Sequence, residues 1–285
     1  MAANTPRIKI DLSFAGTHFR GFQIQSREKT VQGEIESALG KIGFFPKMVG
    51  CSRTDGGVHA RRFTAHCGDA RPARECGEIL RGLNSNLPDG IRVFSVSRVG
   101  PEFHARYSCL EKTYRYFIYL GESPPPPAAP FIEALRPAFS AGRMAEALPL
   151  FAGEHDFRAF TTTDGRRSNT VRNISSAAVL AAGPAVCIEI RGRSFLHRMV
   201  RFIAGALVCY SREKVSADFL RSALSGGEEH LPFPALPAQG LHLWDVVYGE
   251  TEASEKSGEQ CPLALWPFES IGLATVGRAP LQGPR

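Results

Sequence analysis

The stretch from which the rest of the chain can be interpreted is GCSRTDGGVHA, residues 50–60. Arg53 and Asp55 flank a single threonine, two glycines follow, and His59 lies four residues after the aspartate. Residues 44–49 (FFPKMV) predict a strand before it. We therefore expect a strand that runs into a glycine turn and holds a charged pair at a rigid edge of a sheet.

The residues alone leave two roles open for Asp55. A carboxylate can act as a nucleophile, a general base or a metal ligand. It can also cap its own turn by accepting hydrogen bonds from backbone N–H groups, with Arg53 as a surface ion pair. Spacing alone favours this structural interpretation.

The longer string RTDGGVHA, residues 53–60, changes that balance, because it resembles the signature of the TruA family of tRNA pseudouridine synthases. The aspartate is catalytic in that family, so the resemblance implies that role for Asp55. Two departures are visible. Cys51-Ser52 replaces the usual Ala-Gly, and Gly56 replaces a small non-glycine residue.

The N-terminal segment continues the resemblance. Residues 8–14 alternate apolar and polar side chains, which predicts a strand, and a polar loop with Arg20 and Gln23 follows. This loop is similar to the family's first motif, although Phe14, Ala15 and Phe22 replace its Tyr, Asp and Trp. TVQGE, residues 30–34, also matches a family segment, and Thr30 is a good N-cap for a helix there.

The elements up to residue 96 define a fold class. After the helix at residue 31 and the strand before Asp55, we expect a strand over 63–67, a helix over 75–83 and a strand from Ile91. This order is typical of an α+β half in which helices cover one face of an antiparallel sheet.

Near residue 105 a second group of candidates begins. Phe103-His104-Ala105-Arg106 precedes TYRYFIY, residues 113–119, a strand in which tyrosines ordinarily pack in the core. The functional alternative is that one tyrosine stacks on a base while His104, Arg106 and Arg115 contact phosphates. The segment resembles a family motif that makes Tyr114 the active-site tyrosine, with Lys112 in place of the usual Arg.

The first segments of the second half, residues 123–172, say less about function than the motifs that follow them. The proline-rich stretch 123–130 predicts a stiff connector, and a helix is expected over 143–151. GEHDFRAF, residues 153–160, is similar to a family motif, and we expect His155 and Asp156 to form a hydrogen-bond cluster at a helix end. Residues 161–172 are predicted to form a mobile basic loop.

The densest basic cluster lies around residue 195. A strand over 186–191 is expected to lead through Ser194, a good N-cap, into a helix with Arg198 and Arg201 on one flank. FLHRMVR resembles the family's Phe-Leu-x-x-Met-Val-Arg, whose last Arg pairs with the catalytic Asp, here Arg201. LPAQGLHL, residues 236–243, resembles the closing motif and implies that Leu241 lies under the active site.

Composition limits the remaining possibilities. The chain has 285 residues, a net charge of +6 and seven scattered cysteines without a Cys-x-x-Cys pair. This cysteine pattern indicates neither a zinc ribbon nor a disulfide framework. A sequence without a long apolar run or a signal peptide predicts a soluble, cytoplasmic protein without membrane contact.

The resemblance spans residues 8–249 and implies a complete assignment. The fold would be α+β, with two similar halves whose antiparallel sheets join side by side, helices on one face and a basic cleft between the halves. We expect an N-terminal half over 1–105, a C-terminal half over 106–250, and a tail over 251–285 that is poorly ordered or packs peripherally.

The implied activity is isomerisation of uridine to pseudouridine at positions 38–40 of the tRNA anticodon stem-loop, by a homodimer without cofactor or metal. The implied catalytic residues are Asp55, Arg53, Tyr114 and Arg201, and the expected substrate-binding residues are Arg20, Gln23, His59, His104, Arg106, Lys112, Arg198 and Leu241. Three alternatives stay open: a synthase for other tRNA positions or RNAs, an RNA-binding module without turnover, and a metal-dependent hydrolase using His59, His155 and Asp156.

Overall fold

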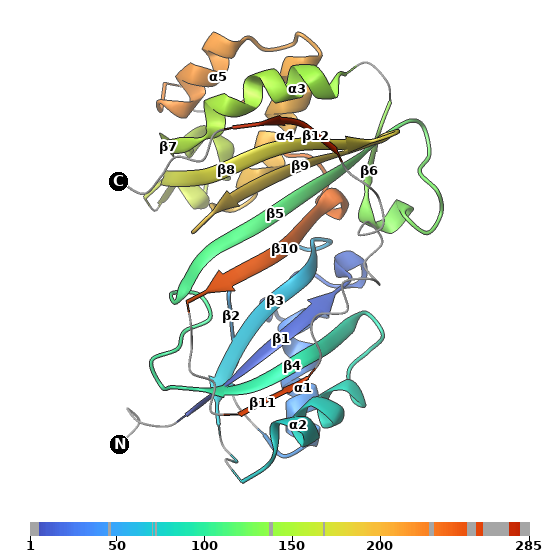
Figure 1. Cartoon of the computed structure of the whole chain (residues 1–285), viewed down its shortest axis with the longest axis vertical. Helices are drawn as coiled ribbons and strands as arrows, with labels where there is room; N and C mark the ends of the chain where they lie inside the picture. Colours follow the sequence, from blue (N-terminus) through green and yellow to red (C-terminus); the bar gives the residue numbers. More distant parts are fainter. Residues whose placement is uncertain are drawn as a thin grey trace. The chain divides into compact units, whose positions relative to one another are not determined.

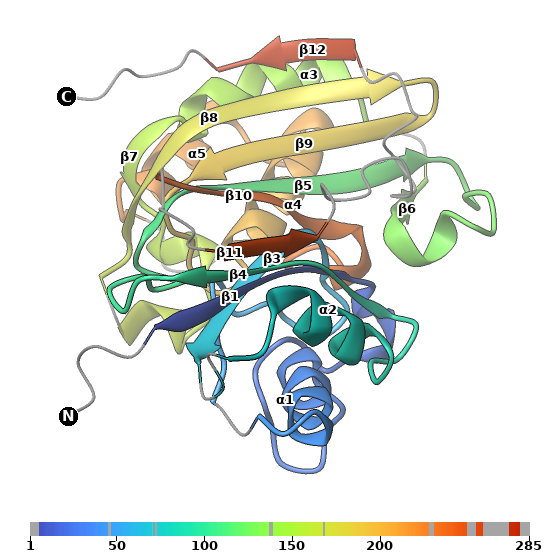
Figure 2. The same cartoon turned by 60° about the horizontal axis from the view of Figure 1, so that its bottom comes forward.

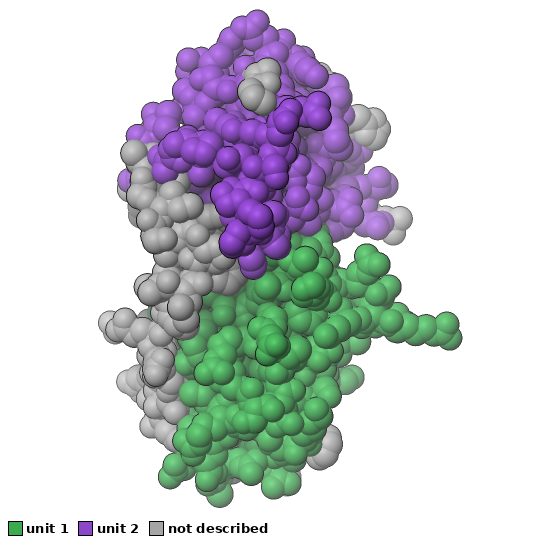
Figure 3. Space-filling model, turned by 90° about the vertical axis from the view of Figure 1, so that its right-hand side faces the viewer, with its two compact units in different colours: residues 1–110, 243–269 green, residues 111–242, 270–285 purple. Residues whose placement is uncertain are grey.

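The computed structural model describes residues 6–44, 47–69, 71, 73–136, 139–167, 169–227, 231–249, 255–258 and 274–279. It is a mixed α+β structure with mostly antiparallel strands and few helices. The chain divides into two compact units, coloured separately in Figure 3. Unit 1 contains residues 1–110 and 243–269, and unit 2 contains residues 111–242 and 270–285.

Unit 1 is built on strands in the order β11-β4-β1-β3-β10 (Figure 1). The central strand β1 pairs antiparallel with β3 and with β4, through Ile10↔Ala65 and Ile10↔Val96. Its residues Ile8, Ile10 and Leu12 are fully buried, as the alternating sequence predicts. The strands are β1 (Arg7–Phe14), β2 (Val49–Gly50, paired with β3), β3 (His59–Gly68), β4 (Ile91–Val99), β10 (Leu241–Tyr248) and β11 (Glu255–Gly258).

Two helices cover one face of this sheet, α1 (Val31–Lys41) and α2 (Cys76–Asn84), as Figure 2 shows. The Thr30 side chain accepts a hydrogen bond from Gly33 N and so caps α1, which confirms the predicted helix start. The apolar stripe of α1 is buried, and the stripe of α2 packs against β4. These helices fix the sheet that carries the Asp55 loop.

Unit 2 contains strands in the order β5-β9-β8-β12. The long strands pair antiparallel, with Tyr114↔Ile190 between β5 and β9 and Val179↔Ile188 between β8 and β9. Two short strands attach to these, β6 parallel to β5 and β7 antiparallel to β8. The strands are β5 (Cys109–Leu120), β6 (Glu133–Leu135), β7 (Gly153–Asp156), β8 (Val171–Ala182), β9 (Ala185–Gly192) and β12 (Ala274–Arg278).

Three helices belong to unit 2, α3 (Ala141–Ala147), α4 (Met199–Ser211) and α5 (Ala217–Leu224). Helix α4 is the most buried of them, and α3 packs against α4, β8 and β12. Short 3-10 helices connect the elements: η1 (Gly16–His18), η2 (Ala129–Phe131), η3 (Leu148–Phe151), η4 (Arg158–Phe160), η5 (Gly165–Arg167) and η6 (Ala238–Gly240).

Several predicted elements are wrong in detail. The strand expected over 44–49 is reduced to β2, with residues 45 and 46 outside the described part. Ser194 does not cap a helix, because α4 begins at Met199 after Arg198, whose φ of 60° is left-handed. His155 and Asp156 lie in the strand β7 rather than at a helix end, and the proline-rich stretch ends in η2.

The units divide the chain differently from the expected halves. The first division lies after Leu110 rather than residue 105, and most of β10 joins unit 1 although its sequence follows unit 2. Within the tail, β11 and β12 are strands, and the rest of 251–285 lies outside the described residues apart from Ala279. Among the described helices, none is both long and apolar enough to cross a membrane.

Candidate active site

The Asp55 loop connects β2 to β3 in unit 1. Cys51 N donates to Thr64 O (2.8 Å) where the loop begins, and Val58 N donates to Asp55 O (3.1 Å) where it ends. Thr54 is buried, Asp55 is half-buried and Arg53 is exposed. The backbone is therefore held at both ends, while the two charged residues between them reach the surface.

A second loop, between β1 and α1, packs backbone to backbone against the Asp55 loop. Phe22 N donates to Thr54 O (3.2 Å). A Cβ atom on Gly16 would lie 2.0 Å from Val58 O, and one on Gly21, whose φ is +101°, would lie 2.5 Å from Thr54 O. Glycine is therefore required at both positions for the two backbones to pack together.

His59, which we expected to bind substrate, is fully buried beneath these loops. Its Nδ1 accepts a hydrogen bond from Gly16 N (3.0 Å). The imidazole thus links β3 to the supporting loop, which is a positioning role for the Asp55 loop. No sequence signal pointed to this role, because Gly16 and His59 are 43 residues apart in the chain.

Two other expected substrate-binding residues, Arg20 and Gln23, are exposed on the supporting loop. Arg20 forms an ion pair with Glu28 (3.3 Å), and its backbone lies next to Gly56. A Cβ atom on Gly56 would be 3.4 Å from Arg20 Cα, an ordinary contact, so the usual small family residue would fit here as well. Unit 1 therefore brings Arg20, Arg53 and Asp55 into one loop cluster.

A second group of site residues lies in unit 2, around β5. The Tyr114 ring is buried and packs edge-on against Phe195, with ring centres 4.9 Å apart. Lys112 is also buried, and its Nζ donates to Arg193 O (3.1 Å). Lys112 thus ties β5 to the segment before α4.

Arg201 lies in the first turn of α4 and is tied to the closing motif. Its Nε donates to Leu236 O (2.6 Å), and Leu236 N donates to Arg201 O (3.2 Å). The Tyr116 hydroxyl donates to the neighbouring Pro237 O (2.8 Å), and Leu241 is buried at the start of β10. The sequence motifs around Tyr114, Arg201 and Leu241 therefore meet in one cluster.

The beginning of the basic loop 161–172 is anchored to the segment before α4. Thr161 Oγ1 donates to His197 O (2.9 Å), and Thr162 Oγ1 forms a hydrogen bond with His197 Nδ1 (2.8 Å). The prediction of a mobile loop missed this contact, because only the fold brings the two segments together. Exposed Arg198 directly follows His197.

His104 and Arg106 do not join the Asp55 cluster. His104 packs against His66, with ring centres 4.9 Å apart, near the end of β3. His59 lies at the beginning of the same strand, seven residues earlier, which corresponds to roughly 23 Å at about 3.3 Å per residue. These two expected substrate-binding residues therefore occupy the opposite end of β3.

His66 predicts a specific dependence of stability on pH. Burial, helped by His104 and Arg7, lowers the pKa of His66 to about 4, and its Nδ1 accepts a hydrogen bond from Ala105 N. The unfolded chain, with a histidine pKa of about 6.5, binds a proton first as the pH falls. The contribution of neutral His66 to the free energy of unfolding is therefore fully present above pH 6.5. It is lost as the pH falls towards 4, by about 2 kcal/mol between pH 7 and pH 5.

Urea unfolding of the wild type and His66→Gln at these two pH values checks this expectation. Glutamine retains an acceptor for Ala105 N but does not titrate. Between pH 7 and pH 5, the free energy of unfolding of His66→Gln should therefore decrease by about 2 kcal/mol less than that of the wild type. An equal loss in both proteins would show that other groups control the pH dependence.

The described residues contain no group of three or more His, Cys, Asp and Glu side chains placed to hold a metal ion. His59 and His155, two members of the proposed hydrolase triad, make backbone hydrogen bonds instead, to Gly16 N and Ala152 O. The six cysteines in the described part are free thiols.

Comparison with known proteins identifies the family. Residues 147–249 match the family model described as tRNA pseudouridine synthase. The chain is 37% identical over 247 residues to tRNA pseudouridine synthase A of Ruminiclostridium cellulolyticum, covering 85% of this chain and 99% of the relative. The chain belongs to the tRNA pseudouridine synthase A family. The proteins of the same name from Shouchella clausii (36% over 246 residues, 86% and 94% covered) and Aquifex aeolicus (37% over 243 residues, 85% and 99% covered) are similar to the same extent.

Membership of the tRNA pseudouridine synthase A family makes the chain an enzyme of the isomerase class. The matched segment contains Arg198, Arg201 and Leu241 in unit 2. The similarity to these relatives extends over most of the chain and is therefore not confined to residues 147–249.

Proposed function

We propose that this protein isomerises uridine to pseudouridine in tRNA, at positions 38–40 of the anticodon stem-loop, with Asp55 as the catalytic residue. The relatives named tRNA pseudouridine synthase A support tRNA as the substrate. The observation that carries the proposal is the Asp55 loop. Its backbone is fixed by β3 and by the Gly16–Gly21 loop, with Asp55 half-buried and Arg53 exposed between these fixed points.

The reaction needs no atoms beyond those of the substrate. The bond between the uracil nitrogen and the ribose breaks, the ring turns, and a bond from a ring carbon to the same ribose carbon replaces it. The proton leaves that ring carbon, and the freed nitrogen takes one up. A carboxylate acting as nucleophile or base therefore suffices, without a cofactor.

The target uridine must first leave its stack, which costs a few kcal/mol. Arg53 is exposed beside Asp55, so we assign it to the vacated position in the RNA or to the flanking backbone. Tyr114 and Arg201 complete the proposed catalytic set on the strength of their motifs: Tyr114 stacks on the base, and Arg201 keeps the catalytic carboxylate ionised. The expected basic cleft, the homodimer and the cytoplasmic location stay predictions.

Mapping of pseudouridine in tRNA incubated with the purified protein tests this function. We expect new pseudouridines at positions 38–40 and at no other uridine. Modification at other tRNA positions would support the related synthase. Binding of tRNA without any pseudouridine would support the RNA-binding module instead, and an activity lost on treatment with a chelator would favour a metal-dependent enzyme.

A further inference from the structure

An exposed aromatic side chain marks a second surface on unit 1. Tyr107 is 67% exposed, more than any other large hydrophobic side chain in the described ranges. Its ring lies against that of His104, with centres 4.3 Å apart and an angle of 33° between the planes. The Arg106 guanidinium lies 5.7 Å from the centre of the Tyr107 ring. We call these three residues the Tyr107 platform.

The turn that carries the platform is rigid. His104 Nδ1 accepts hydrogen bonds from Arg106 N (3.1 Å) and Tyr107 N (3.2 Å). Ser108 closes the turn, because its backbone N donates to His104 O (2.8 Å) and its hydroxyl accepts from His104 N (2.9 Å). The aromatic surface is thus already ordered, so little conformational entropy remains to be lost when a ligand binds.

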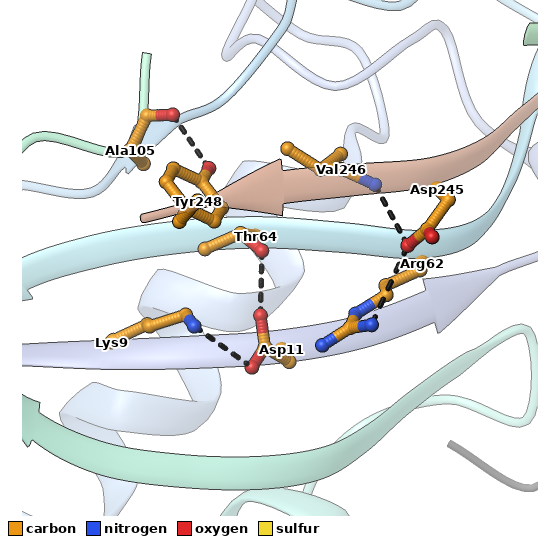
Figure 4. A network of polar contacts seen from close by, with 8 residues as sticks. All are labelled: Lys9, Asp11, Arg62, Thr64, Ala105, Asp245, Val246 and Tyr248. Carbon is orange, nitrogen blue, oxygen red and sulfur yellow. Dashed lines mark hydrogen bonds and ion pairs between the residues drawn. The ribbon is translucent and has the colours of Figure 1, made fainter. Parts of the chain in front are cut away.

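The turn is also fastened to the sheet from two sides. Ala105 N donates to His66 Nδ1 (3.1 Å) on β3, and the Tyr248 hydroxyl donates to Ala105 O (2.6 Å) from β10. Figure 4 shows Tyr248 reaching Ala105, next to the Lys9–Asp11–Thr64 contacts. An arrangement held this firmly, yet with its largest ring in solvent, indicates a ligand for that ring.

The charges around the platform favour an anionic aromatic ligand. The Nδ1 of His104 is an acceptor, and burial, with Arg7 and Arg106 nearby, lowers the pKa of His104, which favours the neutral ring. Positive charge comes from Arg106 beside the ring and from Arg7, which donates to Phe103 O. A neutral ring pair flanked by guanidinium groups suits a nucleobase together with its phosphate.

We propose that Tyr107, supported by His104 and Arg106, stacks on an unpaired base of the RNA substrate at a position remote from the target uridine. This inference rests on the proposed function. Roughly 23 Å along β3 separate His59 from His66, which corresponds to about seven base-pair steps of a nucleic acid. The platform therefore contributes to the choice and affinity of the RNA, and takes no part in the chemistry at Asp55.

The experiment compares the wild type with Tyr107→Ala, Tyr107→Phe and Leu110→Ala. Leu110, three residues further on and 55% exposed, is the matched apolar control. For an unmodified tRNA transcript, Tyr107→Ala is expected to weaken binding about tenfold or more and to raise KM in parallel, with kcat unchanged. Tyr107→Phe and Leu110→Ala should remain within about twofold of the wild type. Photo-crosslinking of the complex should join Tyr107 to an unpaired nucleotide other than the target.

The outcomes separate the two proposals. If the wild type forms pseudouridine while Tyr107→Ala matches it in Kd and KM, the proposed RNA contact of the Tyr107 platform is overturned and the proposed function survives. An equal loss in Tyr107→Phe and Tyr107→Ala would overturn stacking as the cause. A variant that dissociates into smaller species in sedimentation, with unchanged RNA affinity, would assign Tyr107 to a protein contact. If the wild type makes no pseudouridine in any RNA, the proposed function itself fails.

Discussion

Replacing Asp55 with asparagine is expected to abolish pseudouridine formation while tRNA binding stays within a few fold of the wild type. Asparagine matches the size of aspartate and keeps a hydrogen-bonding oxygen, but it carries no charge and is not a nucleophile. Loss of the central group of a catalytic set reduces kcat by at least about 10⁴-fold in comparable enzymes. Single-turnover assays with saturating protein would measure the chemical step apart from binding.

The matched control for Asp55→Asn is Asp218→Asn. The Asp218 side chain is 92% exposed and pairs with Arg221 of the same helix, α5. This variant should keep wild-type kcat and KM, which shows that loss of a surface carboxylate alone has no effect. An Asp55→Asn protein with more than about one hundredth of wild-type kcat would remove Asp55 from the catalytic role.

Gly16→Ala is expected to produce the largest loss of stability from a single methyl group. The added Cβ would lie 2.0 Å from Val58 O, so one of the two backbones must shift at the position where Gly16 N is hydrogen-bonded to His59. We expect a decrease of about 2–4 kcal/mol in the free energy of unfolding. We also expect a reduced kcat, because Val58 ends the turn that holds Asp55.

Gly68→Ala provides the control for this prediction. Gly68 ends β3, and a Cβ atom there would meet nothing within 4 Å, so its free energy of unfolding should remain within about 0.5 kcal/mol of wild type. Urea unfolding of both variants, followed by activity assays on the folded protein, makes the comparison. If Gly16→Ala were as stable and as active as Gly68→Ala, the close packing of the two loops would not support the Asp55 loop.

Local sequence signals predicted the elements whose residues determine their own structure. Helix α1 follows from the Thr30 cap and its buried apolar stripe, and β9 follows from the alternation around Ile188 and Ile190. The Asp55 loop was found by its motif, because the charged pair and the glycines are contiguous. The alternating β1 likewise places its apolar residues in the core.

The missed features depend on contacts that are distant in sequence. The start of α4 is delayed to Met199 because Arg198 adopts a left-handed conformation, although Ser194 is the better cap by residue type. Strand β8 is rich in alanine and serine, so it shows little alternation and is defined by pairing with β9. The burial of His59 and Lys112 is set by Gly16 N and Arg193 O, which motif spacing does not reveal.

The two short tail strands have a consequence for the behaviour of the folded chain in a crowded cell. An uncovered edge strand exposes a row of N–H and C=O groups on which another chain can assemble. Here β11 pairs with β4 and β12 pairs with β8, at the ends of the two strand orders. Strands β11 and β12 thus cover edges of β4 and β8 that would otherwise be open to pairing with another chain.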